Sequence, residues 1–299
     1  MAHDEIRPGA VQRRRTGRLI FWTLLAGIVL VLLVNVLLPD LDLSGEERIA
    51  LVRVEGVILD AQEAVNDLKK YGDHPLVKAI VLRIDSPGGG VVPSQEIHDA
   101  VLRVRHKNNK TVIASMGTVA ASGGYYIAAA ADRIIANPGT LTGSIGVIME
   151  LANVEGLLKK IGVENVVVKS GRHKDIGSPF RAMSGEDRRI LQSVMDDVHK
   201  QFIEAVAEGR SLSVTEVQPL ADGRIFTGRQ AKDAKLVDEL GDLNDAIKLA
   251  AELTGLEGEP KVVEPRKRFS IRELVESRLG LLPRLHFETG VSLKYLMAF

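Results

Sequence analysis

The longest uncharged apolar run lies near the N-terminus, over residues 19–38, where only Thr23 and Asn35 are notably polar. As a helix, its 20 uncharged residues would span roughly 30 Å, the thickness of a bilayer's hydrocarbon core. Arginines precede the run and acidic residues follow it, so the positive-inside rule predicts a cytoplasmic N-terminus. A cleaved signal peptide is the alternative. The length of the run, and the lack of a small-x-small cleavage site after it, favour an uncleaved single-pass anchor in the cytoplasmic (inner) membrane.

Beyond this anchor, short apolar runs alternate with segments of helical periodicity. Residues 1–18 are expected to form a basic cytoplasmic tail, 39–47 a linker, 48–255 the folded extracytoplasmic domain and 256–299 a C-terminal extension. Strands are predicted at 49–54, 79–84, 111–114 and 133–136, and helices at 61–70, 94–106 and 122–130. Repeated β–α units of this length indicate an α/β fold with a largely parallel, buried sheet.

The region after residue 180 is more helical. A capping-box pattern from Ser184 to Asp187 predicts the start of a long amphipathic helix that ends near Gly209. Apolar residues spaced four apart predict that one face of it is packed: Ile190, Val194, Val198, Phe202 and Val206. A shorter helix is predicted at 243–253. The apolar residues 293–299 form either a docking tail or a frayed end.

Composition narrows the class of protein. With 45% hydrophobic and 26% charged residues, the chain is too apolar to be intrinsically disordered. The 39 basic and 39 acidic residues cancel, so the overall charge expected of a nucleic-acid-binding protein is missing. The absence of cysteine excludes disulfides, thiolate zinc sites, iron–sulfur clusters and cysteine nucleophiles.

Two glycine-rich turns follow predicted strands, and each can present main-chain N–H groups to a ligand. The first, residues 85–90, reads Asp-Ser-Pro-Gly-Gly-Gly. Its N–H groups could polarise a carbonyl oxygen or bind an anion, although neither a Gly-Lys-Ser/Thr nor a Gly-x-Gly-x-x-Gly phosphate motif is present. A tight turn without chemistry is the alternative.

The second turn contains Ser122, at the start of a predicted helix. A serine at such a position is most often an N-cap. Its small neighbours would, however, let a substrate backbone approach the hydroxyl. The N–H of Gly123 would point toward the same oxygen that Gly88 or Gly89 could reach. Ser122 is therefore a candidate nucleophile.

A serine nucleophile needs a base, and the sequence offers two neighbouring candidates. Most of the seven histidines fall on polar helix faces, in loops or in the N-terminal tail. His173 instead stands beside Lys174 in a polar loop. A lysine, with an ordinary pKa of about 10.4, accepts a proton only after desolvation lowers that value. The residues alone leave both bases open, together with a solvated surface role for the lysine.

Five motifs, in this order, resemble the signal peptide peptidase SppA family. They are Ser-Pro-Gly-Gly-Gly at 86–90, Ala-Ala-Ser-Gly-Gly-Tyr-Tyr at 120–126, Leu-Thr-Gly-Ser-Ile-Gly-Val at 141–147, Lys-Ser-Gly-x-x-Lys-Asp-x-x-Ser-Pro at 169–179 and Gly-Arg-Ile-Phe-Thr-Gly-Arg at 223–229. The resemblance covers roughly residues 48–250. The single anchor is similar to the short, one-repeat form of the family.

The resemblance implies a role for each motif. Ser122 would be the nucleophile, Lys174 the general base, and Ser144 the residue that orients the lysine ammonium. The oxyanion hole would consist of N–H groups of Gly88 or Gly89 and of Gly123. The family fold is ClpP- and crotonase-like, with stacked β–β–α units. Neither a metal nor another cofactor is expected, and a homo-oligomer is.

The function that the resemblance implies is that of a membrane-anchored serine endopeptidase with a Ser–Lys dyad. Its substrates would be cleaved signal peptides and other short apolar peptides, which concentrate at the bilayer beside the anchor. No nucleic-acid partner is expected. Two alternatives remain: an acyl-CoA hydratase or isomerase on the same fold, and a non-catalytic membrane scaffold.

Overall fold

The computed structural model describes residues 21–27, 45–265 and 294–297. Contacts divide the chain into two units, residues 1–46 and residues 47–299. In the first unit, residues 21–27 are helical and exposed, and the rest of the predicted anchor at 19–38 lies outside the described residues. Among the helices of the described ranges, none has the length and apolar content needed to cross a bilayer.

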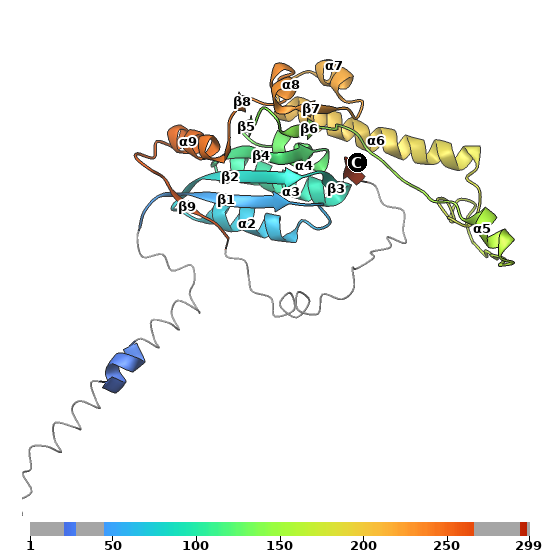
Figure 1. Ribbon diagram of the computed structural model, residues 1–299, viewed down its shortest axis with the longest axis horizontal. Helices are drawn as coiled ribbons and strands as arrows, with labels where there is room; N and C mark the ends of the chain where they lie inside the picture. The colour runs from blue at the N-terminus through green and yellow to red at the C-terminus, as the bar shows by residue number, and fades with distance from the viewer. Residues whose placement is uncertain (1–20, 28–44, 266–293, 298–299) are drawn as a thin grey trace, which may run out of the picture. The chain divides into compact units, whose positions relative to one another are not determined.

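The second unit is built around a mainly parallel sheet (Figure 1). Its described strands are β1 (Arg48–Glu55), β2 (Val77–Ser86), β4 (Thr111–Ala121), β5 (Arg133–Ala136), β6 (Leu141–Gly143), β7 (Ile225–Thr227), β8 (Glu239–Leu240) and β9 (Lys261–Val263). They follow the order β7-β6-β4-β2-β1-β9, and β5 pairs with both β4 and β8. Within the described sheet, the β6–β7 pair is antiparallel and the remaining pairs are parallel. The predicted α/β class with a largely parallel sheet is confirmed.

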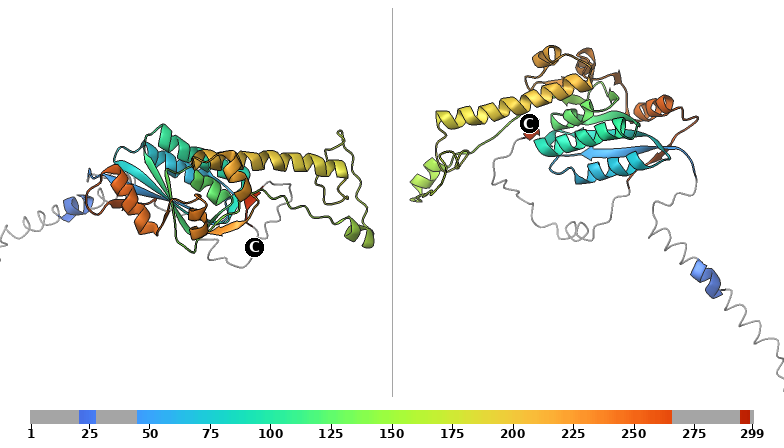
Figure 2. Two further views of the ribbon diagram at one scale, coloured as in Figure 1. Left: turned by 90° about the horizontal axis from the view of Figure 1, so that it is seen from above. Right: turned by 180° about the vertical axis from the view of Figure 1, so that it is seen from behind.

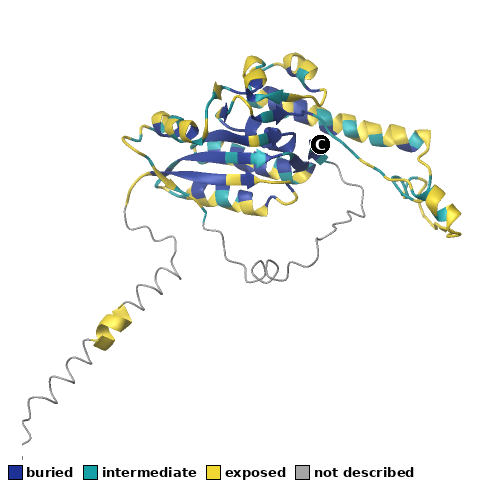
Figure 3. Ribbon diagram, viewed as in Figure 1, coloured by how far each residue is buried: buried dark blue, intermediate teal, exposed yellow. Residues whose placement is uncertain are grey.

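Helices pack on both faces of this sheet (Figures 1 and 2). They are α2 (Gln62–Asp73), α3 (Val91–His106) and α4 (Gly123–Ala129) on one face and α9 (Leu243–Thr254) on the other. Alternation along β1 explains why both faces are covered. Ala50 and Val52 join the cluster beneath α2, α3 and α4, whereas Ile49 and Leu51 pack with α9. The central strands are accordingly buried on both sides (Figure 3).

A long helix extends beyond the sheet and has a short helix near its outer end (Figure 2). These are α6 (Gly185–Gly209) and α5 (Glu155–Lys160), and the shorter elements that follow α6 are α7 (Val214–Val217), the 3-10 turn η1 (Gln218–Leu220) and α8 (Gly228–Asp233). The predicted capping box is confirmed, because Ser184 and Asp187 exchange hydrogen bonds between side chain and main chain. We call residues 150–184 and the first half of α6 the arm.

The prediction that one whole face of α6 is packed is wrong for the arm within this chain. Val198, Phe202 and Val206 are buried against the domain, but Ile190 is 37% exposed and Val194 41% exposed. The physical reason is the length of the helix. At 25 residues, α6 extends past α4, against which its second half packs.

A second, small sheet joins the C-terminal segment to the first glycine-rich turn. It consists of β3 (Gly88–Gly90) and β10 (Lys294–Leu296), which run antiparallel. Tyr295 and Met297 are buried. The described part of the segment 293–299 is therefore docked rather than frayed.

Candidate active site

Ser122 occupies the turn between β4 and α4 in a conformation that L-residues rarely adopt, with φ 53° and ψ −117°. Its N–H donates to the carbonyl of Gly143 at 2.8 Å, which holds the strained turn against β6. Its side chain is 1% exposed, and its Oγ makes no hydrogen bond to a described residue. The side chain therefore does not cap α4, and a buried unpaired hydroxyl at a strained position is typical of a functional site.

The predicted oxyanion glycines lie against the same turn. A Cβ on Gly88, whose φ is +100°, would be 2.7 Å from the Gly123 nitrogen, and one on Gly123 would be 3.2 Å from the Gly89 nitrogen. Only glycine permits main chains to approach this closely. The structure thus brings the three predicted glycines together beside Ser122.

The two candidate donors of the first turn are not equivalent, because the N–H of Gly88 already donates to Ser86 Oγ at 3.1 Å. On the edge that faces Ile58, the Gly88 carbonyl accepts from the Ile58 N–H and the Gly90 N–H donates to the Ile58 carbonyl. Main-chain groups alternate along an extended strand, so the N–H of Gly89 points to the opposite edge. In this turn the N–H of Gly88 is therefore engaged by Ser86, whereas that of Gly89 faces away from Ile58.

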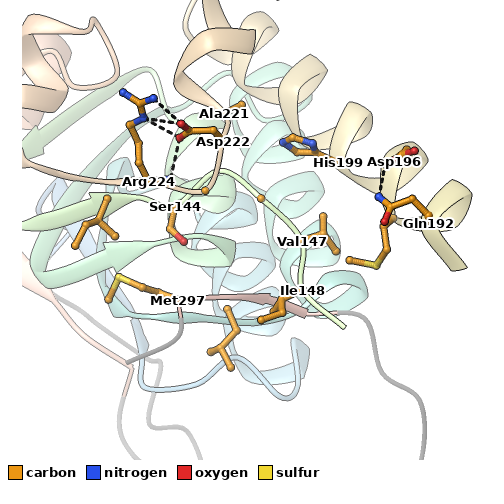
Figure 4. Close-up of a pocket in the computed structure, with 15 residues that line it drawn as sticks. Ser144, Val147, Ile148, Gln192, Asp196, His199, Ala221, Asp222, Arg224 and Met297 are labelled. Carbon is orange, nitrogen blue, oxygen red and sulfur yellow. Dashed lines mark hydrogen bonds and ion pairs between the residues drawn. The ribbon is translucent and has the colours of Figure 1, made fainter. Parts of the chain in front are cut away.

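Ser144 is close to Ser122 in space because the end of β6 pairs with the end of β4. It is buried, has φ 49°, and donates its N–H to the Arg224 carbonyl at 2.8 Å. It lines a cavity of about 700 Å³ that also receives Met297 from the C-terminal segment and His199 from α6 (Figure 4). The structure thus brings the predicted pair of serines close together, with Ser144 in the wall of the cavity.

Lys174 lies on the arm and is exposed. Its neighbour His173 is 3.5 Å from Asp187 in the first turn of α6. Val198 lies 11 residues after Asp187 in α6, which is about 16 Å at the helical rise. Its carbonyl accepts a hydrogen bond from the Tyr295 hydroxyl. Within the described ranges Lys174 has no ion pair or side-chain hydrogen bond. One chain therefore does not bring the predicted dyad together.

An ionic network holds the loop around Lys174 in place. Arg181 bonds to Asp175 at 2.9 Å and to Asp187 at 2.6 Å, and Lys169 bonds to Asp175 at 2.6 Å. Arg181, followed by Lys169, holds the pKa of Asp175 far below its ordinary range, and Arg181 does the same for the pKa of Asp187. These ion pairs thus hold the loop that carries Lys174 in a fixed position at the outer end of α6.

Comparisons with known proteins identify the family. The model of Peptidase family S49 matches residues 104–257. A Synechocystis protein that is named as a protease is 46% identical over 72% of this chain and 77% of its own. An Enterococcus faecium protein named as a signal peptide peptidase SppA is 37% identical over 68% and 63%, and Protease 4 of Salmonella typhi is 39% identical over 70% and 35%. The chain belongs to peptidase family S49.

Membership of family S49 makes this protein a serine peptidase that acts on peptides. Its mixed α/β architecture with a parallel-rich sheet fits the ClpP-like fold of that family. The named relatives are proteases, which favours the peptidase over the hydratase and scaffold alternatives.

Three cleft residues of this S49 peptidase were missed from the sequence. His199 lines the cavity and its Nε2 is buried without a partner among the described residues. Arg224 and Asp222 form an ion pair at the opposite wall (Figure 4). The Gly-Arg-Ile-Phe motif marked the position of Arg224, but no periodicity marked His199. In the described ranges, no group of three His, Asp or Glu residues is placed to hold a metal ion.

Proposed function

We propose that this protein is a membrane-anchored serine endopeptidase in which Ser122 is the nucleophile and Lys174 of a second copy is the base. The observation that carries the proposal is the buried Ser122 Oγ, which no described residue hydrogen-bonds. It stands on a strained turn beside the N–H groups of Gly89 and Gly123. This is the arrangement that acyl transfer needs, with donors aimed at the oxygen on which charge develops.

The arm supports a base supplied by a second copy. It presents an extensive apolar surface that nothing in the described chain covers, including Val166, Val168 and Phe180, of which Val168 is 97% exposed. Exposed apolar surface of this extent marks an interaction site. If the arm of one copy packs over the domain of the next, it can carry Lys174 to the neighbour's Ser122. Burial there would favour the neutral amine that a base requires, with Ser144 placed to orient it.

The proposed reaction proceeds in two balanced halves. Ser122 Oγ attacks the scissile carbonyl carbon while its proton passes to the amine of Lys174, and the resulting oxyanion accepts hydrogen bonds from Gly89 and Gly123. The carbon–nitrogen bond then breaks as the lysine returns that proton to the leaving amine, which leaves an ester on Ser122. Water, deprotonated by the same lysine, hydrolyses the ester and restores the hydroxyl.

The proposed substrates are cleaved signal peptides and other short apolar peptides. Strand β3, next to the Ser122 turn, binds an extended main chain in the chain itself, where it pairs with β10. Val147 and Ile148 give the cavity apolar walls. The apolar run at residues 19–38 would hold the domain at the membrane surface, where such peptides collect.

Serine-directed labelling combined with hydrolysis of an apolar fluorogenic peptide tests the proposal. Ser122→Ala is expected to lose both labelling and hydrolysis. Ser211→Ala is the matched control, because Ser211 also has φ 53° but is exposed and outside the cleft. Lys174→Ala is expected to lose hydrolysis, whereas Lys160→Ala, at the end of α5, is not. Full hydrolysis by Ser122→Ala or Lys174→Ala would overturn the assignment.

A further inference from the structure

Strand β4 contains a β-bulge shortly before it reaches Ser122. Its pairing with β2 is interrupted between Met116 and Ala120, so residues 117–119 lie opposite one β2 residue, Asp85. The bulge also marks a change of neighbouring strand. Before the bulge β4 pairs with β5, and from the last residue of the bulge onward it pairs with β6. Bulges beside active sites commonly re-aim the side chains that follow them.

Polar side chains hold both ends of this bulge. The Asp85 carboxylate accepts a hydrogen bond from the Val119 N–H at 3.0 Å. The Thr140 hydroxyl donates to the Gly117 carbonyl at 2.8 Å. Asp85 also lies so close to Gly117 that a Cβ on the glycine would be 2.6 Å from the Asp85 Cγ. A bulge takes main-chain groups out of the regular ladder, and these side chains supply partners for them, which fixes its shape.

Thr142 connects β6 to β4 just before the two predicted site serines. Its side chain is fully buried, and its hydroxyl donates to the Ala120 carbonyl at 2.6 Å. Ala120 stands two residues before Ser122, and Thr142 stands two residues before Ser144. This hydrogen bond therefore sets the spacing of the two strands at the point where each of them reaches its serine.

The direction of the Ser122 hydroxyl depends on the main chain around it. No described residue hydrogen-bonds its Oγ, so no side chain holds the hydroxyl itself in place. Ser122 has φ 53° and Ser144 has φ 49°. L-residues keep such angles only where the surrounding structure imposes them. For Ser122 that structure includes the end of β4, whose course the bulge and Thr142 determine.

We propose that Thr142 and Asp85 are positioning residues of this peptidase. They fix the bulge of β4 and the spacing of β4 from β6, and thereby aim the Ser122 hydroxyl at the scissile carbonyl. The inference rests on the proposed function for the role of Ser122. Because Thr142 is fully buried, it does not contact a substrate. Loss of its hydrogen bond should therefore slow the chemical step and leave substrate binding unchanged.

The first test replaces Thr142 in the full chain. Thr142→Val keeps the shape of the side chain but removes the hydroxyl. It is expected to lower kcat for an apolar fluorogenic peptide by about 10- to 100-fold, with KM within about twofold of the unaltered chain. Thr142→Ser retains the donor and should keep kcat within about threefold. Thr254→Val is the matched control and should leave kcat unchanged, because the Thr254 hydroxyl donates to the Ala250 carbonyl at 2.7 Å in α9, on the other face of the sheet.

The second test replaces Asp85. Asp85→Ala removes the acceptor of the Val119 N–H and is expected to lower kcat by about tenfold. Asp85→Asn should restore kcat, because an amide oxygen can accept the same hydrogen bond. The rate of serine-directed labelling of Ser122 should fall in the same order as kcat. The pH–rate profile should keep the shape that it has in the unaltered chain, because none of these variants alters the base.

The outcomes separate positioning from mere stability. An unchanged kcat in both Thr142→Val and Asp85→Ala would overturn the inference and leave the proposed function intact. A loss of kcat in Thr142→Ser as large as in Thr142→Val would also overturn it, because packing and not the hydrogen bond would then be responsible. Full hydrolysis by Ser122→Ala would instead overturn the proposed function, and the inference with it.

Discussion

If Lys174 acts on the Ser122 of a neighbouring copy, two variants that are each inactive should recover peptide hydrolysis when they share one oligomer. The perturbation is co-expression of Ser122→Ala chains with Lys174→Ala chains in equal amounts. Each variant alone is expected to lose about 10⁴- to 10⁶-fold in kcat, as serine peptidases do when a catalytic group is removed. In a mixed oligomer, however, a Lys174→Ala chain still supplies Ser122, and a neighbouring Ser122→Ala chain still supplies Lys174.

The size of the recovery follows from the geometry of the arm. Lys174 is anchored beside Asp187, about 16 Å along α6 from the cleft, so each site draws its two groups from different chains. With random mixing and one defined neighbour per site, about a quarter of the sites contain both intact groups. We therefore expect roughly a quarter of the unaltered activity. A dyad within one chain would yield no intact site at all.

The assay is peptide hydrolysis by the purified mixture, with native mass spectrometry to establish that the two variants share oligomers. Co-expression of Ser122→Ala with Lys160→Ala is the matched control, because Lys160 lies on the same arm outside the network around Lys174. Mixed oligomers with no more activity than their parents would refute a base supplied by a second copy. Activity in Lys174→Ala alone would refute the lysine base.

Three further predictions concern the turn, the arm and its ion pairs. Gly88→Ala should lower kcat by about 100-fold, because its φ of +100° and the adjacent Gly123 nitrogen leave no room for a Cβ. Gly139→Ala, with open space around the residue, should leave kcat unchanged in the same peptide assay. Ile190→Ser should shift the oligomer toward monomer in sedimentation experiments. The melting temperature of the domain should not change, since this side chain is exposed in one chain. An unchanged oligomer would contradict the proposed role of the arm. Arg181 lowers the pKa of Asp175 from its ordinary 3.8, so the ion pair stabilises the arm above that pH and is lost as the pH falls below it. Hydrogen exchange in residues 169–187 should therefore increase below that pH. In Arg181→Gln the exchange should already be high at neutral pH, and equal exchange in both proteins would contradict the prediction.

Much of the framework of this protein is encoded locally. The strand 79–84 was predictable because both of its faces are apolar, and the start of α6 because Ser184 and Asp187 stand three residues apart. The two glycine-rich turns were also predictable, because consecutive glycines directly after a predicted strand favour a tight turn. These features depend on residues within one turn or one strand, where periodicity and capping operate.

The composition of the cleft, in contrast, depends on contacts between distant segments. Nothing near Gly88 indicates that its N–H would donate to the Ser86 hydroxyl and not to a ligand. Nothing near Tyr295 indicates that it would pair with Gly89, some two hundred residues earlier in the chain. Pairing of this kind is selected by the fit of side chains and strand edges in three dimensions, which leaves no period in the sequence.

The same limit explains the outcome for α6 and for Lys174. A spacing of four shows that Ile190 and Phe202 share a helix face. Only the tertiary structure decides that Phe202 is covered, by Tyr126 of α4, and that Ile190 is not. The sequence by itself determined which residues are the candidates for the chemistry, since the proposed nucleophile, donors and lysine each stand in a local motif. The tertiary structure decided which of them meet within one chain, because that depends on where each element ends in space.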